Sequence, residues 1–98
     1  KLKTLNEQIF SKLINLEFVN LEGNDFEFLP KNLFQKNQAL QNVMIVSNLK
    51  LKVIKTEFPR SIKNFLLLEN ECIDDYFESS RIKFEKFVEK IHEKCGNF

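Results

Sequence analysis

Apolar residues recur along the first three quarters of this 98-residue chain with a nearly constant spacing. Phe10, Phe34 and Phe58 follow one another at 24-residue intervals. A shared frame of hydrophobic residues and one fixed asparagine returns with them, in residues 13–29, 40–53 and 62–70. A period of this length predicts a solenoid, in which each repeat forms one coil that packs on the next. Such an array presents a long open surface rather than a closed catalytic pocket.

Within each repeat, a short alternation of apolar and polar residues predicts a strand with one buried face. The first copy of this alternation holds Val19 and Leu21. The equivalent residues of the later copies are β-branched, aromatic or large aliphatic, which suits stacked parallel strands. They are Val43, Ile45, Phe65 and Leu67. We therefore expect the three strands to pair in parallel and in register.

Residues 16–30 follow the pattern LxxLxLxxNxLxxLP, and Phe34 stands behind them. This pattern resembles the leucine-rich repeat. The 24-residue period and the Leu-Pro-x-x-x-Phe ending are similar to the repeats of extracellular animal proteins, those of insects included. The resemblance covers roughly residues 1–77 and implies an α/β solenoid. The expected fold is a right-handed superhelix with a short parallel sheet, an irregular convex side and a C-terminal capping helix.

The resemblance also assigns structural roles to two columns of residues. In the family, an asparagine ladder at the bend after each strand hydrogen-bonds the loops of adjacent repeats. Asn24, Asn48 and Asn70 occupy that position in this sequence. The three phenylalanines at the 24-residue interval would stack as a spine under the convex side. One position departs from the frame. Lys50 stands in the second repeat where the first repeat has the apolar Phe26, so the side chain of Leu49 or Leu51 must fill the space in the core.

The two ends of the chain differ from the regular repeats. The first residues match the second half of a repeat, with Leu2 at the position of Phe26 and Leu5 at that of Leu29. We therefore expect residues 1–78 to be leucine-rich repeats at the C-terminal end of a longer array. Residues 79–98 are expected to form a C-terminal cap helix.

The cap helix is predicted from an apolar stripe at three- and four-residue steps. The stripe consists of Phe84, Phe87, Val88, Ile91 and Cys95. Ser79 and Ser80 are candidate N-terminal caps for this helix, and Gly96 is a suitable end. Such a helix can shield the open end of the array, which would otherwise expose its core. The alternative is a helix that binds a partner or a membrane.

The chain has two cysteines, Cys72 and Cys95. Secreted leucine-rich-repeat proteins commonly end in a cysteine-containing cap, so the resemblance implies a disulfide bond between these two residues. It also implies an extracellular protein, either secreted or the ectodomain of a cell-surface protein. The alternative is a pair of buried free thiols in a cytosolic protein. There is no Cys-x-x-Cys motif or histidine cluster, so a zinc site is not expected.

Composition and motifs argue against several classes of function. The 15 basic and 14 acidic residues nearly cancel, and they leave no basic stripe for nucleic acid. The longest apolar runs hold only a few residues, so no membrane insertion is expected. The single histidine, His92, has no nucleophile motif beside it, and Asp74-Asp75 is interpreted as a turn rather than a metal site. We expect no enzymatic activity and no cofactor.

A protein ligand is the partner that the pattern favours. Residues that alternate with the buried strand positions point to the concave face of the predicted sheet. They are Phe18, Asn20, Glu22, Asn42, Met44, Val46, Asn64, Leu66 and Leu68. This face becomes more apolar towards the C-terminus, which favours a protein-binding patch. The alternative is a purely structural fragment, in which the cap covers Leu66 and Leu68 and the ligand binds upstream.

Overall fold

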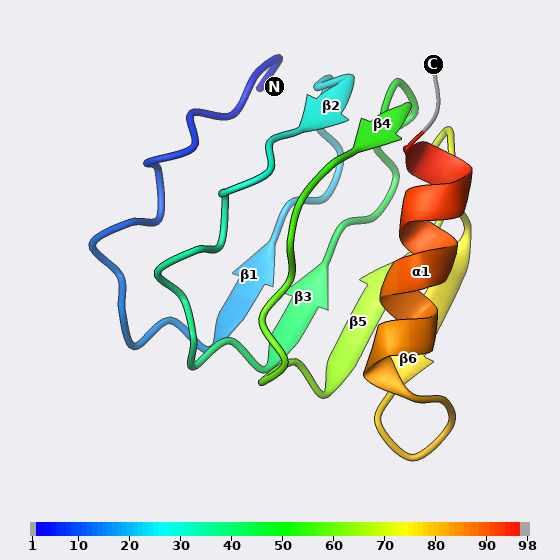
Figure 1. Cartoon of the computed structure of the whole chain (residues 1–98). Coiled ribbons are helices and arrows are strands. Elements are labelled where there is room, and N and C mark those ends of the chain that lie inside the picture. Colours follow the sequence, from blue (N-terminus) through cyan, green and yellow to red (C-terminus); the bar gives the residue numbers. More distant parts are fainter. Residues whose placement is uncertain (1, 97–98) are drawn as a thin grey trace.

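The computed structural model describes residues 2–96. Lys1 and residues 97–98 of the predicted cap segment lie outside the described residues. The described chain contains short strands followed by one helix (Figure 1). These elements are β1 (Phe18–Asn20), β2 (Phe28–Leu29), β3 (Asn42–Met44), β4 (Val53–Ile54), β5 (Asn64–Leu67), β6 (Asp75–Glu78) and α1 (Phe84–Cys95).

The strands form two separate sheets. The four-stranded sheet has the order β1-β3-β5-β6, and the two-stranded sheet pairs β2 with β4. Strands β1, β3 and β5 are mutually parallel, and their register places Phe18, Asn42 and Asn64 in one row, as the repeat spacing predicts. Parallel neighbours require a crossover between them, and the crossovers carry β2 and β4. Figure 1 shows this path, with the chain returning to the larger sheet coil after coil.

The hydrophobic core lies between the two sheets. Val19, Val43 and Phe65 are buried neighbours in the register of the large sheet. Leu29 and Ile54 are fully buried neighbours in the small sheet. Each such side chain contributes roughly 1.5–3 kcal/mol by leaving water. Because side chains alternate across a strand, this core also fixes which residues of the large sheet point outward.

The predicted asparagine ladder is confirmed by its hydrogen bonds. The Asn24 backbone N–H donates to Oδ1 of Asn48 at 2.9 Å, and the Asn48 N–H donates to Oδ1 of Asn70 at 3.2 Å. The side-chain amide of Asn48 also donates to the Val46 carbonyl, and that of Asn70 donates to the Ile45 carbonyl. Backbone groups that turn away from the sheet therefore find partners in the adjacent coil.

The residue before each ladder asparagine has a left-handed backbone. Gly23, Ser47 and Glu69 have φ values of 68°, 56° and 58°. Only glycine adopts this conformation without a steric cost from Cβ. The bend thus imposes the same backbone geometry on three different residue types.

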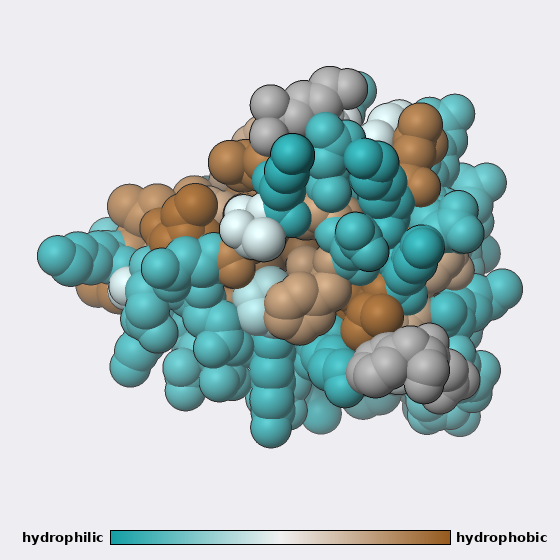
Figure 2. Space-filling model, turned by 90° about the horizontal axis from the view of Figure 1, so that it is seen from above, coloured by the Kyte–Doolittle hydropathy of each residue, from teal (hydrophilic) through white to brown (hydrophobic). Residues whose placement is uncertain are grey.

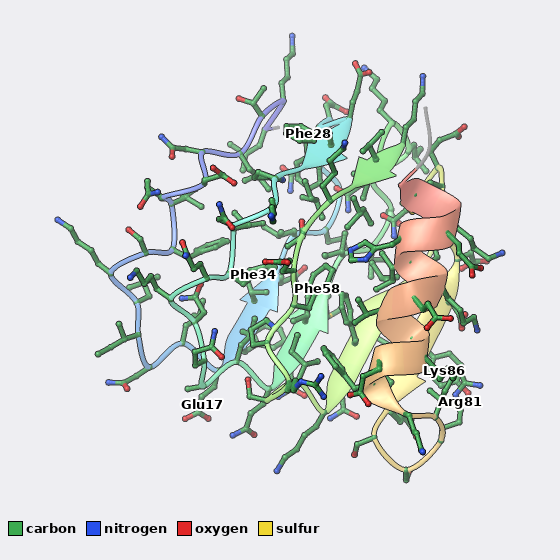
Figure 3. The ribbon with its side chains drawn as sticks, in the orientation of Figure 1. Glu17, Phe28, Phe34, Phe58, Arg81 and Lys86 are labelled. Atoms are coloured by element: carbon green, nitrogen blue, oxygen red, sulfur yellow. A yellow bond between two sulfur atoms is a disulfide. The ribbon has the colours of Figure 1, made fainter. Side chains whose placement is uncertain are left out.

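The phenylalanine spine is also confirmed. The rings of Phe10 and Phe34 are stacked with centroids 5.7 Å apart, and those of Phe34 and Phe58 are 5.9 Å apart. Figure 3 shows Phe34 and Phe58 side by side. At the Lys50 departure, Leu51 fills the gap and is fully buried, whereas Leu49 is 72% exposed.

The C-terminal segment differs from the prediction in two places. The expected turn at Asp74-Asp75 is wrong for Asp75, which begins β6 and pairs antiparallel with β5. The predicted cap at Ser79-Ser80 is also wrong, because α1 begins at Phe84 after an extended Lys83 that makes no side-chain cap. Both errors have one cause: β6 prolongs the sheet to Glu78, so Ser79 and Ser80 are used in the turn that reverses the chain.

Helix α1 packs at one end of the molecule beside β5 and β6 (Figure 1). Phe87, Ile91 and Cys95 form its buried face, as the apolar stripe predicts. The predicted disulfide bond is present and joins Cys72, after β5, to Cys95 at the helix end. Disulfide bonds persist in oxidising compartments, so this one favours a location outside the cytosol.

Candidate ligand-binding face

The outward side of the four-stranded sheet carries the predicted ligand contacts, and we call it the sheet face. It comprises Phe18, Asn20, Glu22, Asn42, Met44, Val46, Asn64, Leu66 and Leu68, together with the outward residues of β6. The register aligns Asn20 with Met44 and Leu66 across three strands. The structure thus brings all nine predicted residues to one side of the sheet. Their contact with a ligand stays a prediction.

The apolar centre of the sheet face is open to solvent in part. Met44, Val46, Leu66 and Leu68 are half-buried, and Phe18 is 52% exposed. Helix α1 does not cover them, because its Phe87 ring packs on the core side against Phe65 and Phe77, at 5.6 and 5.4 Å. Leu66 and Leu68 alternate with Phe65 and Leu67 and therefore point the other way.

Strand β6 adds residues that the sequence analysis does not assign to this surface. Tyr76 pairs with Leu66, and Glu78 pairs with Asn64. Tyr76 is 39% exposed, while Phe77 between them is buried. The signal that could have revealed β6 is this alternation around one buried phenylalanine. It covers only four residues, which is too short to distinguish a strand from a turn.

Side-chain hydrogen bonds order the polar borders of the sheet face. The Asn64 amide donates to Oδ1 of Asn42 at 3.0 Å. At the opposite ends of the strands, the Ser47 hydroxyl donates to Glu69 at 2.9 Å. The Glu69 backbone N–H donates in turn to Oδ1 of Asp74 at 3.1 Å. These bonds hold short polar side chains in place beside the apolar centre.

Ion pairs attach β6 to the segment that follows it. Asp75 lies 2.8 Å from Nζ of Lys90 on α1 and 3.5 Å from the guanidinium of Arg81. Partial burial raises the pKa of Asp75, but hydrogen bonds from Lys90 and the Tyr76 N–H, with the charges of Lys90 and Arg81, outweigh it and hold this pKa below its ordinary value. Figure 3 shows Arg81 in the turn between β6 and α1.

Arg81 also shapes the surface around Tyr76. Its guanidinium carbon lies 4.3 Å from the centroid of the Tyr76 ring, within the range of a cation–π contact. The same group donates to the Tyr76 carbonyl at 2.7 Å. The Tyr76 N–H is bonded to the Asp75 carboxylate. Both backbone groups of Tyr76 therefore have side-chain partners, so the outer edge of β6 is closed to further strand pairing at this residue.

Two adjoining hollows are bordered by residues that do not belong to the sheet face. One, of about 350 Å³, is bordered by Lys31, Gln35 and Arg60, and the second, of about 270 Å³, by Phe84 and His92. His92 Nε2 lies 3.0 Å from the Thr56 carbonyl oxygen, which gives it a role in joining α1 to the coil. Within residues 2–96, no three histidine, cysteine or acidic side chains are placed to hold a metal ion. In the same range, no helix has the length and apolar character needed to span a membrane.

The end of the molecule that carries β1 is apolar. Five exposed aliphatic or aromatic residues belong to the first 18 positions: Leu2, Ile9, Leu13, Ile14 and Phe18. Figure 2 shows brown, apolar surface at this end of the molecule. We call this surface the end face. The strand β1 is the outermost strand of its sheet at this end.

Comparison of the chain with protein-family models, with curated proteins and with solved structures found no match.

Proposed function

We propose that this chain is a leucine-rich-repeat solenoid that acts as a non-enzymatic protein–protein interaction module. Its ligand would bind the sheet face, which corresponds to the concave face of that fold. The observation that carries the proposal is a set of ordered, outward-pointing apolar side chains that α1 leaves uncovered. Met44 and Leu66 lie at its centre, in one row of the register.

The repeat geometry supports the fold part of this proposal. Parallel strands in register, one asparagine per coil bonded to the next coil, and a stacked phenylalanine column are what the resemblance implies. Each of these features depends on the repeat spacing, which is 24 residues between the first copies and 22 between Asn48 and Asn70, rather than on one residue. Their coincidence in one chain favours a repeat array over an unrelated α/β fold.

The shape of the sheet face favours a protein over a small molecule. Small-molecule sites are concave pockets that enclose most of the ligand. The sheet face is instead a broad surface that extends across four strands, with Phe18 on the strand at one edge and Tyr76 on the strand at the other. Protein interfaces combine an apolar centre with a polar border, and Asn42, Asn64 and Glu69 supply such a border.

The disulfide bond supports the compartment that we propose, a secreted protein or a cell-surface ectodomain. A bridge across the cap stabilises a small domain where the surroundings are oxidising. Intact-mass measurement of natively secreted protein without reductant tests this. The mass is expected to be two hydrogens below that of the reduced chain. Two free thiols in the secreted protein would contradict it.

The binding proposal is tested with the double variant Met44→Glu/Leu66→Glu. Two charges at the centre of the sheet face should abolish capture of the ligand by immobilised protein, while circular dichroism stays unchanged. The matched control is Leu49→Glu/Phe28→Glu, because Leu49 and Phe28 are exposed and lie outside the four-stranded sheet. The control should retain full capture. Undiminished capture by the first variant would place the ligand site elsewhere.

A second candidate function is structural, and the end face favours it. In this alternative, the chain closes one end of a longer array, its ligand binds upstream, and further repeats pack on the end face. Leu2, Ile9 and Leu13 lie 24 residues before Phe26, Leu33 and Asn37, and these later residues are buried. The double variant Met44→Glu/Leu66→Glu separates the two functions. It should abolish ligand capture if the chain is an interaction module and should leave capture unchanged if its role is structural.

A further inference from the structure

The addition of β6 turns the sheet face into a surface of three rows and four strands. One row runs Phe18, Asn42, Asn64, Glu78, and the next runs Asn20, Met44, Leu66, Tyr76. Hydrogen bonds from Gly23 to Val46 and from Ser47 to Leu68 extend the pairing by one more row. That third row runs Glu22, Val46, Leu68, Asp74.

The charges on these rows have one sign. Glu22, Asp74 and Glu78 are exposed carboxylates at the borders, and none of the twelve positions is lysine or arginine. Glu69 lies beside the third row and is bonded to Ser47. The chain as a whole is nearly neutral, so this face differs in charge from the rest of the molecule. A ligand surface complementary to it carries positive charge.

The Tyr76 ring adds a second indication of the same preference. It already holds the Arg81 guanidinium at 4.3 Å on one side. Arg81 itself is tied to Asp75 and to the Tyr76 carbonyl, so its charge is partly compensated. An aromatic ring at the edge of an apolar row is a favourable contact for the aliphatic stem and charge of a lysine or arginine.

We propose that the sheet face binds an extended segment of a partner protein in which basic side chains flank an aliphatic one. This inference rests on the proposed function and names the chemistry of its ligand. Strands lie about 4.8 Å apart, so Glu22 on the β1 side and Asp74 on the β6 side are separated by roughly 14 Å. An extended segment covers that distance in about four residues.

The spacing sets the pattern that the ligand must have. In an extended segment, every second side chain points to the same side. A sequence Lys-x-Leu-x-Lys therefore places its leucine over Val46 and Leu68 and its two ammonium groups near Glu22 and Asp74. Polar residues at the x positions would face solvent.

The experiment uses Tyr76 as the reporter, because it is the only tyrosine and the chain has no tryptophan. The full chain is titrated with the probe acetyl-Lys-Ser-Leu-Ser-Lys-Ser-Leu-Ser-Lys-amide, and tyrosine emission is recorded. The expected result is a saturable change that weakens with added salt. The acidic counterpart, with glutamate in place of each lysine, should produce no saturable change.

Two charge variants with equal net charge identify the carboxylates. Glu22→Gln/Asp74→Asn should weaken probe binding by roughly twofold to thirtyfold, because each of the two exposed ion pairs contributes only modestly to the affinity. The asparagine at 74 retains an oxygen that can accept from the Glu69 N–H. The control Glu27→Gln/Glu57→Gln removes two exposed carboxylates outside the four-stranded sheet and should leave the affinity unchanged.

The outcomes separate this inference from the proposed function. Equal binding of the acidic and basic probes, or equal losses in the two charge variants, would overturn the charge preference. If Met44→Glu/Leu66→Glu still reduces capture of the ligand in that case, the sheet face remains the binding site with another partner chemistry. If neither probe produces a saturable change, the preference for a basic segment is rejected.

Discussion

Oδ1 of Asn48 accepts a hydrogen bond from the backbone N–H of Asn24, which lies 24 residues earlier in the chain. The Asn48 side chain is fully buried, and its amide donates to the Val46 carbonyl. One side chain thus satisfies polar groups of two coils at a bend where water is excluded. The repeat spacing therefore brings the asparagine of one coil within hydrogen-bonding distance of the backbone of the adjacent coil.

Replacement of this asparagine should be costly. Asn48→Ala leaves the Asn24 N–H without its partner, and an unsatisfied buried group costs about 1–3 kcal/mol, whereas the Val46 carbonyl keeps the hydrogen bond from the Gly23 N–H. We therefore expect a loss of about 1–3 kcal/mol in the free energy of unfolding, measured by urea denaturation. Asn20→Ala is the control, because Asn20 is exposed and bonds only locally to the Glu22 N–H. Equal losses in the two variants would show that the ladder contributes little.

Gly23 offers a test of backbone strain without a packing change. Its φ is 68°, and a Cβ atom added there meets nothing within 4 Å. Gly23→Ala should therefore lower stability by about 1 kcal/mol through the left-handed conformation alone. Gly23→Asn should cost less, since asparagine tolerates that conformation. A higher melting temperature for Gly23→Ala than for Gly23→Asn would contradict this account.

The lowered pKa of Asp75 predicts a dependence of stability on pH. A carboxyl group with a lower pKa in the folded state stabilises the protein above its unfolded-state pKa, and this contribution is lost as the pH falls through the folded-state value. The ordinary value is 3.8, so the loss is confined to acid below that pH. Asp75→Asn should destabilise by up to about 1 kcal/mol near neutrality, because the ion pairs are partly exposed.

The same Asp75→Asn variant should approach the wild-type stability in acid. Urea denaturation at both ends of the pH range checks this, with Glu89→Gln on the exposed side of α1 as the control. A difference between Asp75→Asn and the wild type that stays constant with pH would assign the effect to packing instead of charge.

The disulfide bond should contribute measurably to the stability of the cap. It joins residues separated by 23 positions, and the chain-entropy estimate for a loop of that size is roughly 3 kcal/mol. Cys72→Ser/Cys95→Ser is therefore expected to lower the free energy of unfolding by about this amount. Addition of reductant should shift the wild type towards the variant and leave the variant unchanged. A reductant effect on the variant would point to another cause.

Much of the arrangement of this protein is set by local spacing. The period that separates Phe10, Phe34 and Phe58 brings them into ring contact, and the period that separates Asn24 from Asn48 makes them hydrogen-bond partners. The alternation around Val19 and its equivalents decides which side chains are buried, because a strand can turn only one face to the core. The nine residues predicted for the concave face share one surface for the same reason.

Tertiary structure alone decided the C-terminal end. Asp75–Glu78 becomes a strand because β5 offers it an unpaired edge, and that partner cannot be seen from four residues of sequence. The later start of α1 follows, as does the place of Tyr76 beside Leu66. The core also decided that Leu51 and not Leu49 fills the gap at Lys50, since Leu51 is fully buried and Leu49 is exposed. Local pattern thus determined the repeating contacts of this protein, and competition for long-range partners determined the structure of its C-terminal end.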